Sequence, residues 1–230
     1  MNDFLSFIIN QVIPHLNTGF FVSIKLIVPS ALLGFLIGVV IGALRVYGPW
    51  PVRKLCNFYV AVFRGTPLVV QLYFWYFALP YTNFWGVRIV MSATACAIVG
   101  FSLCSGAYHS EYIRGGLLSI KTGQLKAAQA LGMTPFTSVK SIVLPQAFRH
   151  CFSGCCNEVI YLIKYSSLAS IITINEMTGI GRGIAKASFR NVETFLVVGM
   201  YYLILVTLAG AILNYFERRM EIPGFDRQVR

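Results

Sequence analysis

The sequence predicts an all-α integral membrane protein with five transmembrane helices, its N-terminus outside the cytoplasm and its C-terminus inside. Three observations support this fold class. Of the 230 residues, 57% are hydrophobic and only 12% are charged, about half the charged fraction of an ordinary soluble domain. The apolar residues form stretches of bilayer length. The basic residues lie mainly in the loops between these stretches.

The chain begins with an N-terminal extracytoplasmic segment, residues 1–17, followed by a first span at about residues 20–45. Gly34, Gly38 and Gly42 recur every four residues in this span. This spacing places them on one face of a helix and allows a second helix to approach closely. The second helix could belong to a dimer partner or to the same subunit.

Four further spans complete a membrane domain that covers residues 18–216. They are expected at about residues 57–80, 89–112, 150–174 and 194–216. The segment between the last two spans is expected to be a loop, and its glycines at 179, 181 and 183 to form a flexible turn. Residues 217–230 form a polar cytoplasmic tail.

The distribution of Lys and Arg predicts the orientation. Twelve of these residues lie after the first span, after the third span and in the C-terminal tail, against four in the loops on the other side. Basic loops are retained in the cytoplasm, so the third loop and the C-terminus are expected inside. The net charge of +11 resides in these loops. It therefore indicates a lipid bilayer as the surroundings and no nucleic-acid partner.

Residues 114–149, between the third and fourth spans, are expected to form a cytoplasmic elbow of two helices. Gly132 can adopt the left-handed conformation that ends a helix. Thr134 and Pro135 then provide a side-chain cap and a first-turn proline for the second helix. Pro145 is expected to break that helix. A polar elbow on one side of a bilayer is suited to hold a soluble partner.

The elbow also carries a motif. Ala127-Ala128 is followed after three residues by Gly132, after nine more by Ile142, and after one more by Leu144-Pro145. This spacing resembles the EAA loop of ABC importer permeases. The flanking segments at 63–68 and 111–116 are similar to the polar amino-acid branch, which acts on histidine, arginine, glutamine or glutamate.

The resemblance covers about Thr18 to Phe216 and implies a type I importer fold. It implies a permease subunit that forms the translocation path for a polar L-amino acid in an ATP-driven importer. The expected location is the bacterial cytoplasmic (inner) membrane, which the chain would cross several times.

Three protein partners are implied by the same resemblance: a dimer of ABC ATPase subunits, a second permease that is identical or related, and an extracytoplasmic amino-acid-binding protein. The residues assigned to ATPase coupling are Gly123, Gln124, Lys126, Ala127, Ala128, Leu131 and Gly132. Lys126 stands where the family usually has Glu. A compensating change in the ATPase, an acid kept by the second permease, or the small value of an exposed ion pair (under ~1 kcal/mol) could explain it.

No catalytic or metal site is expected in this chain. The sequence has no Gly-Lys dipeptide, so the phosphate-binding motif G-x-x-x-x-G-K is absent. ATP and Mg are therefore expected on the partner ATPase, and no cofactor on this chain. The six cysteines form no Cys-x-x-Cys pair, which argues against a zinc site. Cys151, Cys155 and Cys156 are either thiols at a span entrance or small apolar filler.

The fourth span contains the best candidates for a substrate path. A charge at a helix centre costs at least ~2.5 kcal/mol, so it normally faces a cavity or a partner. Glu158 and Lys164 are about 240° apart around a helix and should not pair, whereas Asn157, Tyr161 and Lys164 share a face. We hypothesise that Glu158 holds a cationic group of the substrate. The alternative is that Glu158 and Lys164 bond to neighbouring helices.

Three more residues complete the candidates, together with Pro145 as support for the elbow. Arg64 could steer a substrate carboxylate along the path, or serve as an anchor or a lock on the elbow. Glu111 and Arg114 are three residues apart and should pair across one helical turn, which would support the elbow.

Two other classes of protein predict different features in the sequence. A secondary carrier or channel without an ATPase predicts internal repeats, and no convincing repeat is present. A membrane hydrolase needs a nucleophile beside a base, and none of the three histidines has a Ser or Cys partner at a suggestive spacing.

Overall fold

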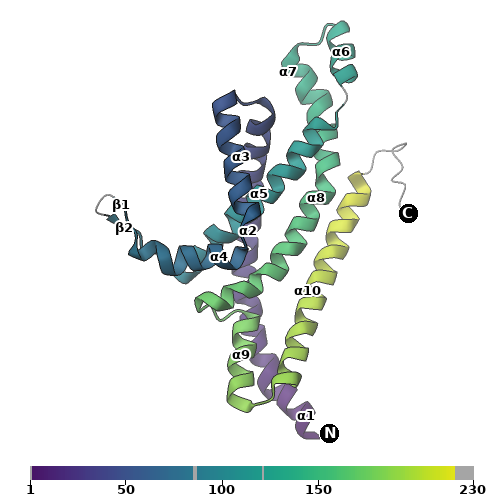
Figure 1. Cartoon of the computed structure of the whole chain (residues 1–230). Coiled ribbons are helices and arrows are strands. Elements are labelled where there is room, and N and C mark those ends of the chain that lie inside the picture. Colours follow the sequence, from purple (N-terminus) through teal and green to yellow (C-terminus); the bar gives the residue numbers. More distant parts are fainter. Residues whose placement is uncertain (1, 85–86, 121, 221–230) are drawn as a thin grey trace.

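The computed structural model describes residues 2–84, 87–120 and 122–220, and these are almost entirely helical (Figure 1). The helices are α1 (Asn2–Phe7), α2 (Ile13–Tyr47), α3 (Trp50–Gly65), α4 (Leu68–Tyr73), α5 (Ala93–Leu118), α6 (Thr122–Ala130), α7 (Pro135–Ser138), α8 (Leu144–Tyr165), α9 (Met177–Ser188) and α10 (Asn191–Met220). Three π-helical turns, η1 (Ile8–Val12), η2 (Phe74–Ala78) and η4 (Val139–Val143), and two 3-10 segments, η3 (Leu79–Tyr81) and η5 (Ser166–Ile172), join some of them. Strands β1 (Asn83–Phe84) and β2 (Val87–Arg88) pair antiparallel.

The helix of the first span begins far earlier than residue 20. α1, η1 and α2 form one helical stretch from Asp3 to Tyr47, 45 residues long. At 1.5 Å per residue this stretch is about 67 Å long, roughly twice the ~30 Å hydrocarbon core of a bilayer. The expected N-terminal segment is therefore a helical extension of the first span, and it reaches α9.

The second expected span is bent. α3 and the stretch from α4 to η3 meet at an angle of 103°. Pro67 causes the break, because its ring forces the preceding Thr66 into an extended conformation (φ −114°, ψ 143°). The Gln71 side-chain amide then donates to the carbonyl oxygens of Phe63 and Thr66, at 2.9 and 3.1 Å, which stabilises the corner.

The glycine stripe of the first span packs within the subunit, against α5. A Cβ atom added to Gly38 would lie 2.3 Å from the Cβ of His109, and one added to Gly34 would lie 3.0 Å from the Cβ of Ser105. Only glycine allows the two helices to approach this closely. Of the two alternatives, the structure therefore shows packing with a helix of the same chain.

The elbow has the expected local structure at its corner. Gly132 has φ +81°, and the Thr134 hydroxyl accepts a hydrogen bond from the Thr137 amide at 3.2 Å. The prediction for Pro145 was wrong, because α7, η4 and α8 continue without a break. The π-helical turn η4 lies directly before Pro145, where a wider turn leaves room for the proline ring.

The predicted loop between the last two spans is also mostly helical. The glycines at 179–183 lie in α9, so the prediction of a flexible turn was wrong. Glu176 begins this helix, because its carboxylate accepts hydrogen bonds from the amides of Thr178 and Gly179, both at 2.8 Å. The connection from η5 turns at Thr173, which has a positive φ of 70°.

In the described part of the chain, two helices are long and apolar enough to cross a membrane by themselves, or three if the bent pair counts as one span. α5 is less apolar, and it is packed between α2, α3 and α8. A helix covered by protein does not need a fully apolar surface. The elbow and the end of α10 lie at one end of the molecule, and α1 and α9 lie at the other (Figure 1).

Candidate functional site

A cluster of three arginines around one carboxylate lies at the elbow end of the helices. Glu111 of α5 pairs with Arg45 of α2 at 2.9 Å, Arg64 of α3 at 3.0 Å and Arg114 of α5 at 3.0 Å. Arg45 also donates to the side-chain oxygen of Asn57, at 2.7 Å. The expected pair of Glu111 and Arg114 is therefore present, within a larger cluster that joins three helices.

Arg64 lies in this cluster, and its guanidinium also stacks over the ring of Tyr108 at 5.1 Å. Both contacts hold it at the junction of α3 and α5. Among a steering group, an anchor and a lock on the elbow, this position of Arg64 favours the lock. The Arg64 side chain is 40% exposed, so a substrate or a second subunit could also contact it.

α8 separates the fourth-span candidates onto two faces. Asn157, Tyr161 and Lys164 are exposed on the same face, as their spacing predicts. The Lys164 ammonium lies 4.4 Å from the centre of the Tyr161 ring, which in turn stacks on Tyr165 at 6.1 Å. The exposed face therefore presents an amide, two aromatic rings and a cation to whatever lies beside α8.

Glu158 lies about 60° around α8 from Tyr161 and about 100° from Asn157, and it is only 2% exposed. Its carboxylate lies close enough to Ser105 of α5 to interact with it. The Ser105 hydroxyl also lies 3.1 Å from Nδ1 of His109, which is bonded to the Ser105 carbonyl oxygen as well. Among the ion pairs of the described residues, none joins Glu158 to Lys164.

The elbow projects as a separate feature beyond the helix ends (Figure 1). Gly123, Gln124, Lys126 and Ala127 are exposed, whereas Ala128 is buried against the rest of the elbow. Two large apolar side chains stand at its tip, with Leu131 84% and Phe136 75% exposed. Exposed apolar groups rimmed by polar ones are typical of a surface that binds another protein. Of the seven coupling candidates, six are exposed, counting Leu131 and Gly132.

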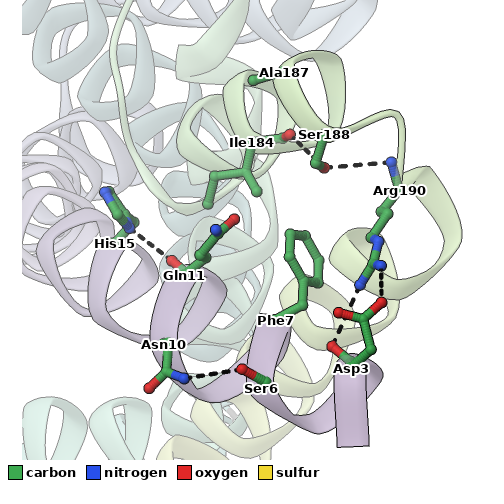
Figure 2. Close-up of a pocket in the computed structure, with 10 residues that line it drawn as sticks. All are labelled: Asp3, Ser6, Phe7, Asn10, Gln11, His15, Ile184, Ala187, Ser188 and Arg190. Atoms are coloured by element: carbon green, nitrogen blue, oxygen red, sulfur yellow. Dashed lines mark hydrogen bonds and ion pairs between the residues drawn. The ribbon is translucent and has the colours of Figure 1, made fainter. Parts of the chain in front are cut away.

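A polar cavity of about 530 Å³ lies at the other end, between the N-terminal helix and α9 (Figure 2). Its walls carry hydroxyl, amide, imidazole and charged groups from facing helices; the lining residues are Asp3, Ser6, Phe7, Asn10, Gln11, His15, Ile184, Ala187, Ser188 and Arg190. Asp3 forms an ion pair with Arg190, whose guanidinium lies over the Phe7 ring. The N-terminal helix is thereby fixed to the start of α10.

Sequence reasoning missed this cavity and the buried network around Glu176. Asp3 and Arg190 are too far apart in the chain for their spacing to show a contact. Glu176 is fully buried, and its carboxylate also accepts a hydrogen bond from the hydroxyl of Tyr202 at 2.7 Å. An acidic residue directly before an apolar helix was the one available signal, because such residues cap helices.

The described residues contain no cluster of three or more His, Cys, Asp or Glu side chains that could hold a metal ion. All six cysteines are free and buried. Cys151, Cys155 and Cys156 line one small cavity together with His109. The sequence did not indicate that His109 lies beside these three cysteines.

These features define a helical membrane subunit with a projecting elbow, and the proteins that it matches are permease subunits of transport systems. The chain belongs to the family of binding-protein-dependent transport system inner membrane components, whose model matches residues 34–222.

The chain is similar to several named permeases. It is 38% identical to the octopine transport system permease protein OccM of Rhizobium radiobacter over 213 residues, which are 90% of this chain and 86% of that protein. It is 34% identical to the arginine transport system permease protein ArtQ of Bacillus subtilis, over 91% of this chain and 94% of ArtQ. It is 37% identical to the glutamine transport system permease protein GlnP of Escherichia coli, over 82% and 85%.

Two solved structures share the fold. A crystal structure of an amino acid ABC transporter with histidines matches with a TM-score of 0.85 and 28% identity, over 94% of this chain and 98% of that chain. An inward-facing structure of the MetNI methionine ABC transporter matches with a TM-score of 0.74 over 90% of this chain. At 22% identity, the second likeness concerns the fold alone.

Proposed function

We propose that this chain forms the translocation path for a polar L-amino acid in an ATP-driven importer of the bacterial inner membrane. The main observation behind this proposal is the projecting elbow with its exposed Leu131 and Phe136. The relatives of the chain include octopine, arginine and glutamine permeases. A permease subunit that does not bind ATP needs a docking surface through which an ATPase subunit can drive its conformational change.

The chain crosses the membrane five times in this proposal, with α1 outside and the elbow and α10 end inside. The uneven distribution of Lys and Arg supports this orientation. The ATPase dimer, with its ATP and Mg, then binds at the elbow. A second permease subunit completes the path, and the extracytoplasmic amino-acid-binding protein docks at the end formed by α1 and α9, where the polar cavity offers hydrogen-bonding groups.

The substrate path follows the exposed face of α8. Asn157, Tyr161 and Lys164 offer polar and aromatic contacts there, and the Lys164 ammonium suits a carboxylate, the group that all amino acids share. Glu158 is buried beside this face and would hold a cationic group of the substrate only after a rearrangement. Its burial and its interaction with Ser105 of α5 support the alternative, in which Glu158 contacts a neighbouring helix.

The test is ATP-driven uptake by the intact complex. We would purify the complex from its native membrane through a tag on this chain, identify its subunits by mass spectrometry, and reconstitute it in vesicles. Uptake of labelled arginine, histidine, glutamine and glutamate is then measured with and without ATP. Uptake of one or more of them only with ATP is expected. Uptake without ATP, from vesicles that contain no ATPase, would instead establish a secondary carrier.

Two variants then separate the path residues. Lys164→Gln should reduce uptake while leaving the assembled complex intact, because the exposed ammonium forms no ion pair with any residue that the structure describes. Glu158→Gln distinguishes the two roles of that residue: lost uptake by an intact complex supports substrate contact, and normal uptake excludes it. Glu193→Gln, a charge change at the start of α10 away from this face, is the control.

A further inference from the structure

The exposed face of α8 continues onto α5 through the ring of Tyr112. Gly154, Asn157 and Tyr161 follow one another at intervals of three and four residues, so they lie on one face of α8. A Cβ atom added to Gly154 would lie 2.5 Å from the ring of Tyr112, which therefore packs on this face. Tyr112 is also close enough to Tyr161 and to Arg64 of α3 to interact with both. Three helices thus share one surface.

Cations of the protein already cover two aromatic rings of this surface. The Arg64 guanidinium lies 5.1 Å from the centre of the Tyr108 ring, and the Lys164 ammonium lies 4.4 Å from the centre of the Tyr161 ring. Tyr161 also stacks on Tyr165. An aromatic ring attracts a cation through its face. A cationic ligand would therefore compete with Arg64 and Lys164 for these rings and be repelled by their charges.

The two carboxylates that the described residues place near this surface do not balance its positive charge. Glu111 already holds three arginines, and Glu158 is only 2% exposed. Against these two carboxylates stand four basic side chains, namely Arg45, Arg64, Arg114 and Lys164. Unbalanced charge within a membrane costs free energy. The excess of positive charge therefore favours an anionic ligand.

Lys164 and Arg64 both keep hydrogen-bond donors for such a ligand. Lys164 is exposed and forms no ion pair with a carboxylate of the described ranges. Glu111 lies 3.0 Å from Nη1 of Arg64, but a guanidinium has five N–H donors, so others remain for a second acceptor. Two separate cations on one surface suit a ligand with two carboxylates.

We propose that the transported amino acid carries two carboxylates, one bound by Lys164 and the other by Arg64. This inference rests on the proposed function and names the substrate class. The Asn157 amide oxygen and the Tyr112 hydroxyl oxygen accept hydrogen bonds from the ammonium group of the substrate. Glutamate and aspartate have this chemistry, as does an amino acid whose nitrogen carries a carboxylated substituent. Glutamine, histidine and arginine lack the second carboxylate.

The test compares glutamate with glutamine, which has nearly the same shape but no second carboxylate. Equilibrium binding of labelled L-glutamate to the purified permease–ATPase complex is measured without the extracytoplasmic binding protein, so that only the permease selects the ligand. Unlabelled glutamate or aspartate should displace the label at concentrations about tenfold lower than glutamine or arginine. A factor of about ten is the size expected for one hydrogen bond to a charged group.

Two variants test the two cations. Lys164→Gln and Arg64→Gln should each weaken glutamate binding about tenfold. One of these cations holds the carboxylate that glutamine lacks, so the preference for glutamate should disappear in one variant and persist in the other. Arg64→Gln loses only an exposed pair with Glu111 and should still assemble. Lys54→Gln is the matched control, because Lys54 is an exposed lysine 4.2 Å from the centre of the Trp50 ring, at the start of α3.

Three results would overturn this substrate class while leaving the proposed function in place. The first is displacement of glutamate by glutamine at equal concentrations, with ATP-driven uptake of an amino acid intact. The second is preferred binding of arginine that Glu158→Gln abolishes, which would establish a cationic substrate held by Glu158. The third is an unchanged preference for glutamate in both Lys164→Gln and Arg64→Gln. A complex without ATP-driven uptake of any amino acid would instead refute the proposed function, and the substrate class with it.

Discussion

The substitution Glu111→Gln should destabilise the whole membrane domain, because one carboxylate holds three arginines. The Glu111 and Arg45 side chains are 22% and 8% exposed. Removing one partner of a fully buried ion pair costs about 3–5 kcal/mol. Arg64 and Arg114 are 40% and 37% exposed, and exposed pairs each contribute under ~1 kcal/mol.

The expected loss lies near the lower limit for a buried pair, about 3 kcal/mol. For a domain of this size each kcal/mol lowers the melting temperature by about 2–4 °C, so a decrease of about 6–12 °C follows. The assay is thermal unfolding of the purified protein in detergent, followed by size-exclusion chromatography after heating. The substitution keeps the side chain's size, so the lost charge is the main change.

Arg114→Gln is the matched control, because it removes one exposed member of the same cluster. It should lower the melting temperature by no more than about 2–4 °C, the effect of an exposed pair. If Glu111→Gln melts at the same temperature as Arg114→Gln, then Arg45 does not depend on Glu111 and the proposed role of the cluster is wrong.

Three other predictions follow from described features. Gly38→Ala should cost about 1–3 kcal/mol, because its Cβ would lie 2.3 Å from that of His109; Gly199→Ala, with nothing within 4 Å of its Cβ, is the control in the same unfolding assay. Gly132→Ala strains a residue with φ +81° by about 1–2 kcal/mol, so it should reduce the ATPase activity of the purified complex without lowering the melting temperature of the membrane domain; Gly199→Ala, outside the elbow, should leave that activity unchanged. Burial raises the pKa of Glu176 although its carboxylate accepts hydrogen bonds. The folded state therefore keeps this proton to a higher pH than the unfolded state, and the resulting stability is complete below the ordinary glutamate pKa and is lost as the pH rises through the raised one. In the Glu176→Gln variant the melting temperature should depend less on pH between these two pKa values than it does in the wild type. An unchanged dependence would show that Glu176 is not the group that titrates.

Local signals predicted the elbow well. Gly132, Thr134 and Pro135 act through their own backbone conformation and their nearest neighbours, so the sequence is enough to place the corner. Pro145 shows the limit of this reasoning. Whether a proline ends a helix depends on whether the preceding turn can widen, and the π-helical turn at Val139–Val143 does so here.

Contacts between distant segments could not be predicted in the same way. Helical spacing correctly placed Asn157, Tyr161 and Lys164 on one face, but it did not show that α5 covers the face with Glu158. The sequence also contained Arg45, Arg64 and Glu111 with nothing to show that three helix ends meet. Such contacts depend on how α2, α3 and α5 cross, and that is decided by packing between helices.

The arginine cluster has a consequence for biosynthesis. The ribosome makes Arg45 and Arg64 well before Glu111, so both cations emerge without their counter-ion. Unpaired cations of this kind retain a loop in the cytoplasm while earlier segments enter the bilayer. Glu111 arrives only with α5, and then it binds both side chains. In the orientation that we propose, Arg45 thus serves first as a topology signal and later as a partner of Glu111, in an order set by the direction of translation.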